Sequence, residues 1–392
     1  MRNSPMANQQ SSPRQIFKAA FAPEPAIPID RELQVSRGLR SFLATMDALV
    51  GSQRTNIHND ASKTTRRLSP WVATGYAFHF CHSSCWHEYA VWMMPIAMHR
   101  LFGELHGVTC DRLYLAESLE DWIRLSPSER RDKLQVHTSG LFSRLEAGHT
   151  FAASGLAGAV DQWSLVTEGD PGHTRFLHQD LLQTEQTWLD LPDLEQSGGL
   201  PWLGYQPGMD DRQHPGGLFP GAALVLRPGE AITPAPPEMR VRLVLQAALD
   251  MHQAPTSQLP EKEGQQIYYG AEAFRHLAHD LTRIPQPDEI PENCSLSSSG
   301  RWDMLVQRLT DLQAGREAAA TFCLLSAEEV PVGRDHLLGA ASHYQNQVAL
   351  IKSNFATLLC QKEPSCQSVA TWLHRDDNMA KAGCALNMLL TE

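Results

Sequence analysis

Basic side chains are in deficit in this 392-residue sequence, where 33 Lys and Arg residues stand against 44 Asp and Glu residues. The formal net charge of −11 repels a phosphate backbone, so a dedicated nucleic-acid binder is not expected. The chain also lacks an apolar run near the ~18 residues that a membrane-spanning helix needs. We therefore expect neither a nucleic acid nor a membrane as a partner.

Cysteine is scarce as well, with eight residues in 392. Apart from the pairs Cys81/Cys85 and Cys360/Cys366 they are scattered, unlike the framework of a small disulfide-stapled secreted domain. Residues 1–14 contain no apolar stretch of the ~7–15 residues found in secretory signals, and residues 1–29 read as a disordered lead-in. A cytoplasmic protein is the expectation.

The front part of the chain mixes helix and strand signals. Apolar residues at helical spacing predict a helix over Leu39–Leu49 that ends near Gly51, followed by a polar loop over Ser52–Pro70. Ser126, Pro127 and Glu129 form the capping pattern of a helix start. Further elements are expected as a helix over Val136–Ala147 and short strands over Thr150–Ser154, Trp163–Thr167 and Ala222–Leu226.

Beyond Pro237 the pattern is helical to the end. Apolar spacing predicts four helices, over Met239–Met251, Ala271–Leu281, Trp302–Leu312 and Arg316–Ala327. In a last helix the apolar residues step by four and three, as Leu337, Ala341, Tyr344, Val348, Ile351, Phe355 and Leu358. Such a seam favours packing within a bundle. The alternative is a coiled coil that joins two subunits, so a homodimer is a candidate assembly.

The densest group of reactive side chains is the run from His79 to His87, which includes Cys81, His82 and Cys85. If a helix begins at Ser84, the sulfur of Cys85 lies near unsatisfied backbone N–H groups and the positive end of the helix dipole. Both favour the thiolate over the thiol. Cys85 is therefore the candidate nucleophile.

The string Ser84-Cys85-Trp86 resembles the nucleophile segment of papain-like cysteine peptidases, where Ser-Cys-Trp begins the central helix. The resemblance implies a histidine base roughly 130–150 residues downstream. His214 follows Cys85 by 129 residues and is the candidate base.

Two other readings of this run stay open. In the first alternative, Cys85 is a buried, inert thiol and His214 is an ordinary loop histidine. In the second, Cys81 and Cys85 with His82 or His87 bind zinc, which needs a fourth ligand from Cys110, or from His99 with His106. No second ligand pair with finger-like spacing follows. We therefore expect no metal and no cofactor.

The order of segments along ~350 residues resembles the proteins related to butirosin biosynthesis protein H. The matching pieces are the helix 40–50, Gly75-Tyr76-Ala77-Phe78, Gly148-His149-Thr150-Phe151-Ala152, the run Trp163–Asp170, Tyr269-Gly270-Ala271, Gly315-Arg316 and Ala340-Ala341-Ser342-His343-Tyr344. The resemblance implies a papain-like α+β front domain and a helical C-terminal domain. It also implies acyl transfer through a cysteine at the start of the first helix and a histidine on a strand.

The sequence departs from this family at both catalytic places. The first helix offers Ser41 and Phe42, and the strand carries Gln162 and Trp163. The resemblance and the composition together predict a lead-in at 1–29, a papain-like domain at 30–235 and a helical domain at 236–392. The expected function is cysteine-dependent acyl or peptidyl transfer in specialised metabolism, with Cys85 and His214 acting on an acyl- or peptidyl-bearing substrate or carrier. The expectation includes a catalytically degenerate relative of such an enzyme. The alternatives are a non-catalytic binding or scaffold protein on the same fold, and a protein that binds zinc through the 79–87 His/Cys run.

Overall fold

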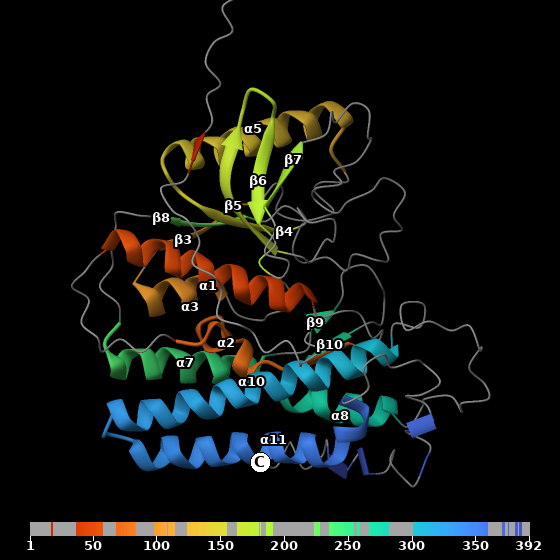
Figure 1. Ribbon diagram of the computed structural model, residues 1–392. Helices are drawn as coiled ribbons and strands as arrows, with labels where there is room; N and C mark the ends of the chain where they lie inside the picture. Colours follow the sequence, from red (N-terminus) through yellow and green to blue (C-terminus); the bar gives the residue numbers. More distant parts are fainter. Residues whose placement is uncertain are drawn as a thin grey trace, which may run out of the picture.

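The structure is a computed structural model (Figure 1) that describes residues 17–18, 37–57, 68–83, 98–107, 109–113, 124–154, 163–179, 181, 186–190, 223–227, 235–254, 257–258, 266–281, 301–359, 371–372, 375, 381–382 and 384–385. Within these ranges, helices are combined with two antiparallel sheets. The expected α+β class is confirmed, whereas its papain-like subclass stays a prediction.

The larger sheet has seven strands, with six in the order β3-β8-β4-β5-β6-β7 and β1 paired with β5. The predicted strands at 150–154 and 163–167 are confirmed as β4 and β5, which run antiparallel with Ser154 opposite Trp163. The predicted strand at 222–226 is β8. The bounds are β1 Phe17–Lys18, β3 Thr109–Leu113, β4 Phe151–Ser154, β5 Trp163–Asp170, β6 Arg175–Gln179, β7 Gln186–Asp190 and β8 Ala223–Arg227.

Strand β1 lies inside the stretch that the sequence predicts to be a disordered lead-in. Phe17 pairs with Gly169 and Lys18 with Glu168, beyond the part of β5 that β4 covers. The open edge of β5 supplies backbone partners that a short polar sequence does not reveal. The rest of 1–29 lies outside the described ranges, so the disordered lead-in stays a prediction.

Helix α5 (Pro127–Glu146) covers one face of the large sheet (Figure 1). Its start confirms the sequence prediction: the Ser126 hydroxyl accepts from the Glu129 backbone, and the Glu129 carboxylate accepts from the Ser126 backbone. The helix expected separately at 136–147 is the second half of the same helix. Phe142 reaches the sheet and packs on Phe176 with ring centroids 4.5 Å apart.

Helix α1 (Arg37–Ile57) lies on the other side of β5, where Phe42 meets Trp163 edge to face at 5.1 Å. The predicted helix is confirmed but its end near Gly51 is wrong, because α1 continues for six more residues. Apolar spacing marks only the buried side of a helix. The largely polar residues 52–57 extend the helix without leaving that signal.

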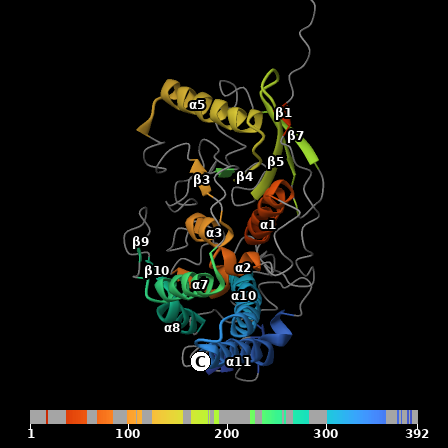
Figure 2. The ribbon, with the colours of Figure 1, turned by 90° about the vertical axis from the view of Figure 1, so that its left-hand side faces the viewer.

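The helical layer lies below α1 (Figures 1 and 2) and contains the predicted helices of the C-terminal half. The two helices expected at 302–312 and 316–327 form one continuous helix, α10. The bounds are α2 Pro70–Ala73, the 3-10 turn η1 Tyr76–Phe78, α3 Met98–His106, α7 Pro237–His252, α8 Gly270–Leu281, α10 Arg301–Glu329 and α11 Arg334–Leu359.

Helices α10 and α11 run side by side in both views (Figures 1 and 2). Leu337, Ala341, Val348, Ile351 and Phe355 of the predicted seam are buried, and Tyr344 is partly buried. Among the described residues, α10 and α11 each contribute to two hydrophobic clusters. Packing within a bundle, as the apolar spacing favoured, is therefore confirmed for the seam.

A second, three-stranded sheet was not expected from the sequence. Strand β2 (Cys81–Ser83) pairs antiparallel with β10 (Gln266–Tyr269), which in turn pairs with β9 (Ser257–Gln258). The expectation of helices from Pro237 to the end is thus wrong at β9 and β10. Both strands are too short to show the alternation that identifies a strand.

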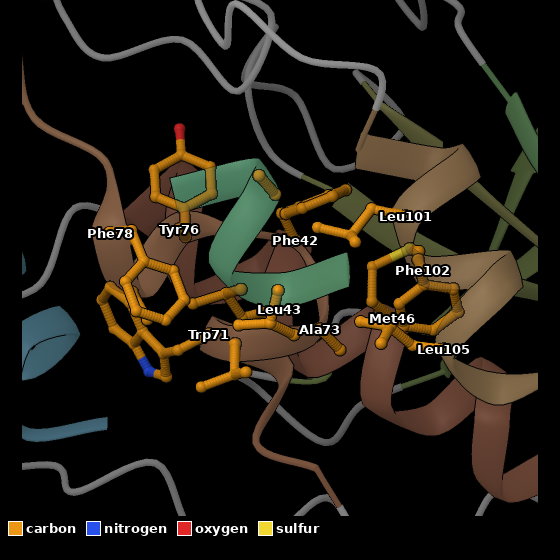
Figure 3. Close-up of a cluster of buried hydrophobic side chains, with 14 of the residues drawn as sticks. Phe42, Leu43, Met46, Trp71, Ala73, Tyr76, Phe78, Leu101, Phe102 and Leu105 are labelled. Atoms are coloured by element: carbon orange, nitrogen blue, oxygen red, sulfur yellow. The ribbon is translucent and has the colours of Figure 1, made fainter. Parts of the chain in front are cut away.

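One hydrophobic cluster links both sides of the predicted domain boundary at 235/236. Figure 3 shows part of it, including Phe42 and Met46 of α1, Phe102 of α3 and Trp71 of α2. Val244 and Met251 of α7, Phe322 of α10 and Ala341 of α11 belong to the same cluster. The division into two domains stays a prediction, and the two parts share a core.

No described helix combines the length and apolar character that a membrane crossing requires.

Candidate functional site

The first half of the predicted reactive run lies deep in the protein, where it enters the small sheet as β2 and contacts α10. Gly75 has φ of 82°, a left-handed conformation that glycine adopts without strain, and it turns the chain from α2 into η1. His79 and Phe80 then lead into β2. Side chains along this segment are buried, with His79 exposed by 6%, Cys81 by 2% and His82 not at all.

His82 connects three elements. Its Nε2 lies 2.7 Å from Oδ2 of Asp280 on α8, and its Nδ1 is hydrogen-bonded to Nη1 of Arg308 on α10. The backbone of His82 is part of β2, opposite Tyr268 of β10. Arg308 is 2% exposed, so a guanidinium charge is held inside the protein close to a neutral ring and a carboxylate.

The partners of His82 determine its tautomer. A guanidinium has only N–H donors, so Nδ1 of His82 must accept from Arg308 with its lone pair. The ring proton is then on Nε2 and is donated to the Asp280 carboxylate. Both ring nitrogens are engaged, which leaves no lone pair of His82 for a metal ion or for proton abstraction from a substrate.

The electrostatics of this group favour the neutral ring. Burial is the main cause that lowers the pKa of His82 from 6.5 to about 4, and the charge of Arg308 lowers it further against the opposing effect of Asp280. Burial raises the pKa of Asp280, but the hydrogen bond and charge from His82 outweigh it and hold that pKa below its ordinary value. At neutral pH, a neutral His82 therefore connects the charged Asp280 and Arg308 side chains through two hydrogen bonds.

Tyr76 and His79 form a second part of the same buried region. Their rings meet edge to face at 5.4 Å, and His79 also lies 6.3 Å from the Tyr269 ring. Burial, followed by the charge of Arg316, lowers the pKa of His79 to about 3. Burial also raises the pKa of Tyr76 well above 10, and nearby Cys81 and Asp311 raise it further. Neither Tyr76 nor His79 is poised to exchange a proton near pH 7.

The Tyr76 hydroxyl points away from the apolar side chains that surround its ring (Figure 3). Among the described residues this buried oxygen has no hydrogen-bond partner.

Helix α10 holds the 76–83 segment at a second place. Arg316 Nη1 donates to the Ala77 carbonyl oxygen at 2.7 Å, and its guanidinium lies 5.7 Å above the Tyr344 ring. Gly315 allows the close approach, since a Cβ there would lie 3.3 Å from the carbonyl oxygens of Tyr76 and Ala77. Gly315-Arg316 is one of the pieces on which the family resemblance rests, and its role here is to fix the turn η1.

The two places where the resemblance puts a cysteine and a histidine meet in the structure. The Ser41 hydroxyl oxygen on α1 accepts a hydrogen bond from the Trp163 backbone N–H at 2.8 Å, and both residues are buried. Phe42 packs on the Trp163 ring beside them. The junction contains a hydroxyl bound to the backbone and two aromatic rings, without a thiol or an imidazole on Ser41, Phe42 or Trp163.

Cys85 and His214, the predicted nucleophile and base, lie outside the described residues, as does the expected helix start at Ser84. The structure therefore leaves their pairing a prediction. Of the possible zinc ligands, His82 is committed to Asp280 and Arg308. No group of three His, Cys, Asp or Glu side chains in the described part of the chain is arranged to bind a metal ion.

Asp280 and Arg308 were missed by the reading of the sequence. A signal for Arg308 existed, because it lies on the apolar side of the predicted helix at 302–312, between Leu305 and Leu312. An arginine in that place needs a partner inside the protein. Nothing in the sequence indicates that the partner is His82, 226 residues earlier.

A separate polar group closes the β5–β6 hairpin. Oδ2 of Asp170 lies 2.9 Å from His173 Nδ1 and accepts from Arg175 Nε and Nη2 at 3.2 and 3.1 Å. Arg175 also lies 4.5 Å above the Trp188 ring on β7. These contacts join the turn to the last strand of the sheet. They also give the buried Asp170 carboxylate its hydrogen-bond partners, so its role is structural.

No protein-family model matches this chain, and no curated protein sequence matches it. The resemblance to the butirosin H-related proteins therefore rests on the residues quoted above.

Proposed function

We propose that this chain is a catalytically degenerate relative of the acyltransferases that it resembles, and that it acts as a binding or scaffold protein. The contact between Ser41 and Trp163 carries the proposal. It lies where the resemblance puts the catalytic pair, and it satisfies a backbone N–H with the hydroxyl that replaces the thiol. A nucleophile needs access to its substrate, and Ser41 is fully buried.

The buried region around His82 supports the same proposal. Its histidines favour their neutral forms, and the lone pair of His82 is used by Arg308. Groups of this kind fix segments relative to one another and do not exchange protons with a substrate. Acyl- or peptidyl-bearing carriers remain the proposed partners, which this protein would bind without transferring the acyl group.

The second candidate is acyl transfer by Cys85, with His214 as its base. The observation that favours it is the firm attachment of β2, which ends two residues before Cys85. His82 is held by α8 and α10, and Gly270 N–H donates to the Phe80 carbonyl at 3.0 Å. Catalytic groups work best when the neighbouring chain is held in place.

Mass spectrometry of the protein incubated with a simple acyl thioester separates the two candidates. The degenerate reading expects no acyl adduct on Ser41 or Cys85. An adduct on Cys85 that is lost in Cys85→Ser and reduced in His214→Ala would support the second candidate and overturn the first. An adduct on Ser41 would contradict both, because it would require access to a buried hydroxyl.

A further inference from the structure

His82 is the shared contact of two parts of the helical layer. On one side are β10 and α8, which follow each other in sequence, and on the other is α10. Asp280 attaches the imidazole to the first part, and Arg308 attaches it to the second. The two bonds respond oppositely to protonation, because one partner is an acceptor and the other is a donor.

We propose that His82 is an acid-released connection: protonation at Nδ1 breaks its bond to Arg308 and loosens α10, while its bond to Asp280 keeps β2 attached to α8. The proton comes from solvent and no other bond changes. This inference goes beyond the proposed function and does not depend on it.

Chemistry at the two nitrogens accounts for the asymmetry. A proton on Nδ1 removes the only acceptor that the ring offers to Arg308, and it places an N–H and a positive charge against the guanidinium. On the opposite side, Nε2 still donates to Asp280, and the contact becomes an ion pair between imidazolium and carboxylate. Acid thus weakens one bond and strengthens the other.

Charged groups on α8 and α10 also affect the protonation of His82. His276 on α8 stacks on Tyr268 of β10 at 3.4 Å, and its positive charge disfavours a charged His82. His279 Nδ1 lies 3.6 Å from Oδ1 of Asp280, the carboxylate oxygen that His82 does not contact. On α10, Arg308 is the cation that faces the ring. Burial, then the charges of Arg308 and His276, lower the pKa of His82 to about 4 against the opposing effect of Asp280, so the release is expected as the pH falls toward 4.

Contacts elsewhere keep α10 in place, so the release is expected to be local. Arg316 binds the Ala77 carbonyl, and Lys352 of α11 pairs with Glu317 at 2.8 Å. Both contacts involve the second half of α10. The half that contains Arg308 is the part expected to open.

Hydrogen exchange measured by mass spectrometry at about pH 7 and about pH 4.5 tests the proposal, after correction for the intrinsic pH dependence of exchange. Peptides from residues 301–312 should exchange roughly tenfold faster at the lower pH, while peptides from 266–281 change by less than about twofold. Unchanged exchange in 301–312, or an equal change in both regions, would overturn it.

Two variants identify the responsible group. His82→Gln keeps an acceptor for Arg308 and a donor for Asp280 without titrating, so the acid response of 301–312 should disappear. His79→Gln is the matched control and should retain the response. If His82→Gln does not fold, Arg308→Gln keeps an N–H donor without the charge and should reduce the response. A full response in either His82→Gln or Arg308→Gln contradicts the proposal.

Discussion

The hydroxyl of Ser41 accepts a hydrogen bond from the backbone N–H of Trp163, across 122 residues of sequence and inside the protein. The contact joins α1 to the first residue of β5, at the place where the resemblance predicts catalysis. Its removal should therefore affect stability and not activity.

Ser41→Ala leaves the Trp163 N–H buried without its acceptor, and we expect a loss of about 1–3 kcal/mol in the free energy of unfolding. Urea unfolding at neutral pH measures it. Thr45→Val is the control, since the Thr45 hydroxyl donates to the Ser41 carbonyl at 2.7 Å within the same helix. That carbonyl also takes part in the backbone hydrogen bonds of the helix. Thr45→Val should therefore lower the free energy of unfolding by less than about 1 kcal/mol. Equal losses in the two variants would contradict this reading of Ser41.

Gly270 is required where β10 passes into α8. Its φ is +52°, and a Cβ there would lie 2.6 Å from the His252 carbonyl oxygen. We expect Gly270→Ala to lower the free energy of unfolding by about 2–4 kcal/mol, from left-handed strain and this clash. Gly339→Ala in α11 has open space at Cβ and should raise it by about 0.5–1 kcal/mol. Calorimetric melting temperatures of both variants test this prediction. It is contradicted if Gly270→Ala melts at the same temperature as the parent protein.

Stability should fall on acidification before the carboxylates titrate. The pKa values of His82 and His79 are lowered in the folded protein to about 4 and about 3, so the unfolded chain binds protons first. The contribution of these two neutral histidines to the free energy of unfolding is complete above the ordinary pKa of 6.5. It is lost as the pH falls toward 4 and then 3.

His82 alone accounts for roughly 3 kcal/mol across that range. The lowered pKa of Asp280 adds a loss only below its ordinary value of 3.8. Urea unfolding at a series of pH values measures the slope, and the double variant His79→Gln/His82→Gln should flatten it between about pH 6.5 and pH 4. A slope unchanged in the double variant would show that other groups cause the acid loss.

The purified protein should contain less than one zinc ion per chain. Both ring nitrogens of His82 are hydrogen-bonded, so the His/Cys run lacks one of its predicted ligands. Elemental analysis after dialysis against a weak chelator is the measurement. One tightly held zinc per chain would favour the zinc-binding alternative, with either His87 as the histidine ligand or His82 released from Arg308.

Thiol reactivity near about pH 6 ranks the two candidate functions. Burial raises the pKa of Cys323 to about 11, and Cys81 is buried, so both should resist iodoacetamide in the folded protein. Cys384 is exposed and serves as the internal reference. Labelling of Cys85 ahead of Cys384 would support a thiolate nucleophile. Labelling of Cys384 with Cys85 unmodified would support the binding protein.

Much of the helix and strand pattern follows from local sequence. The Ser126–Glu129 capping box, the β4–β5 pair and the seam of α11 were predicted because each depends on residues a few positions apart. Element ends were less predictable. At α1 the helix continues through polar residues, and at α10 it continues through Gln313, Ala314 and Gly315, which break the apolar spacing.

The candidate site depended on tertiary structure. Local sequence identified the His/Cys run and the absence of a cysteine near Ser41. It could not show that His82 lies between Asp280 and Arg308, or that Ser41 lies against Trp163, because these contacts span 122 to 226 residues. Spacing along the chain reports neighbours within one helix or strand. The environment that sets a tautomer, a pKa or access to a nucleophile is made by elements that only folding brings together.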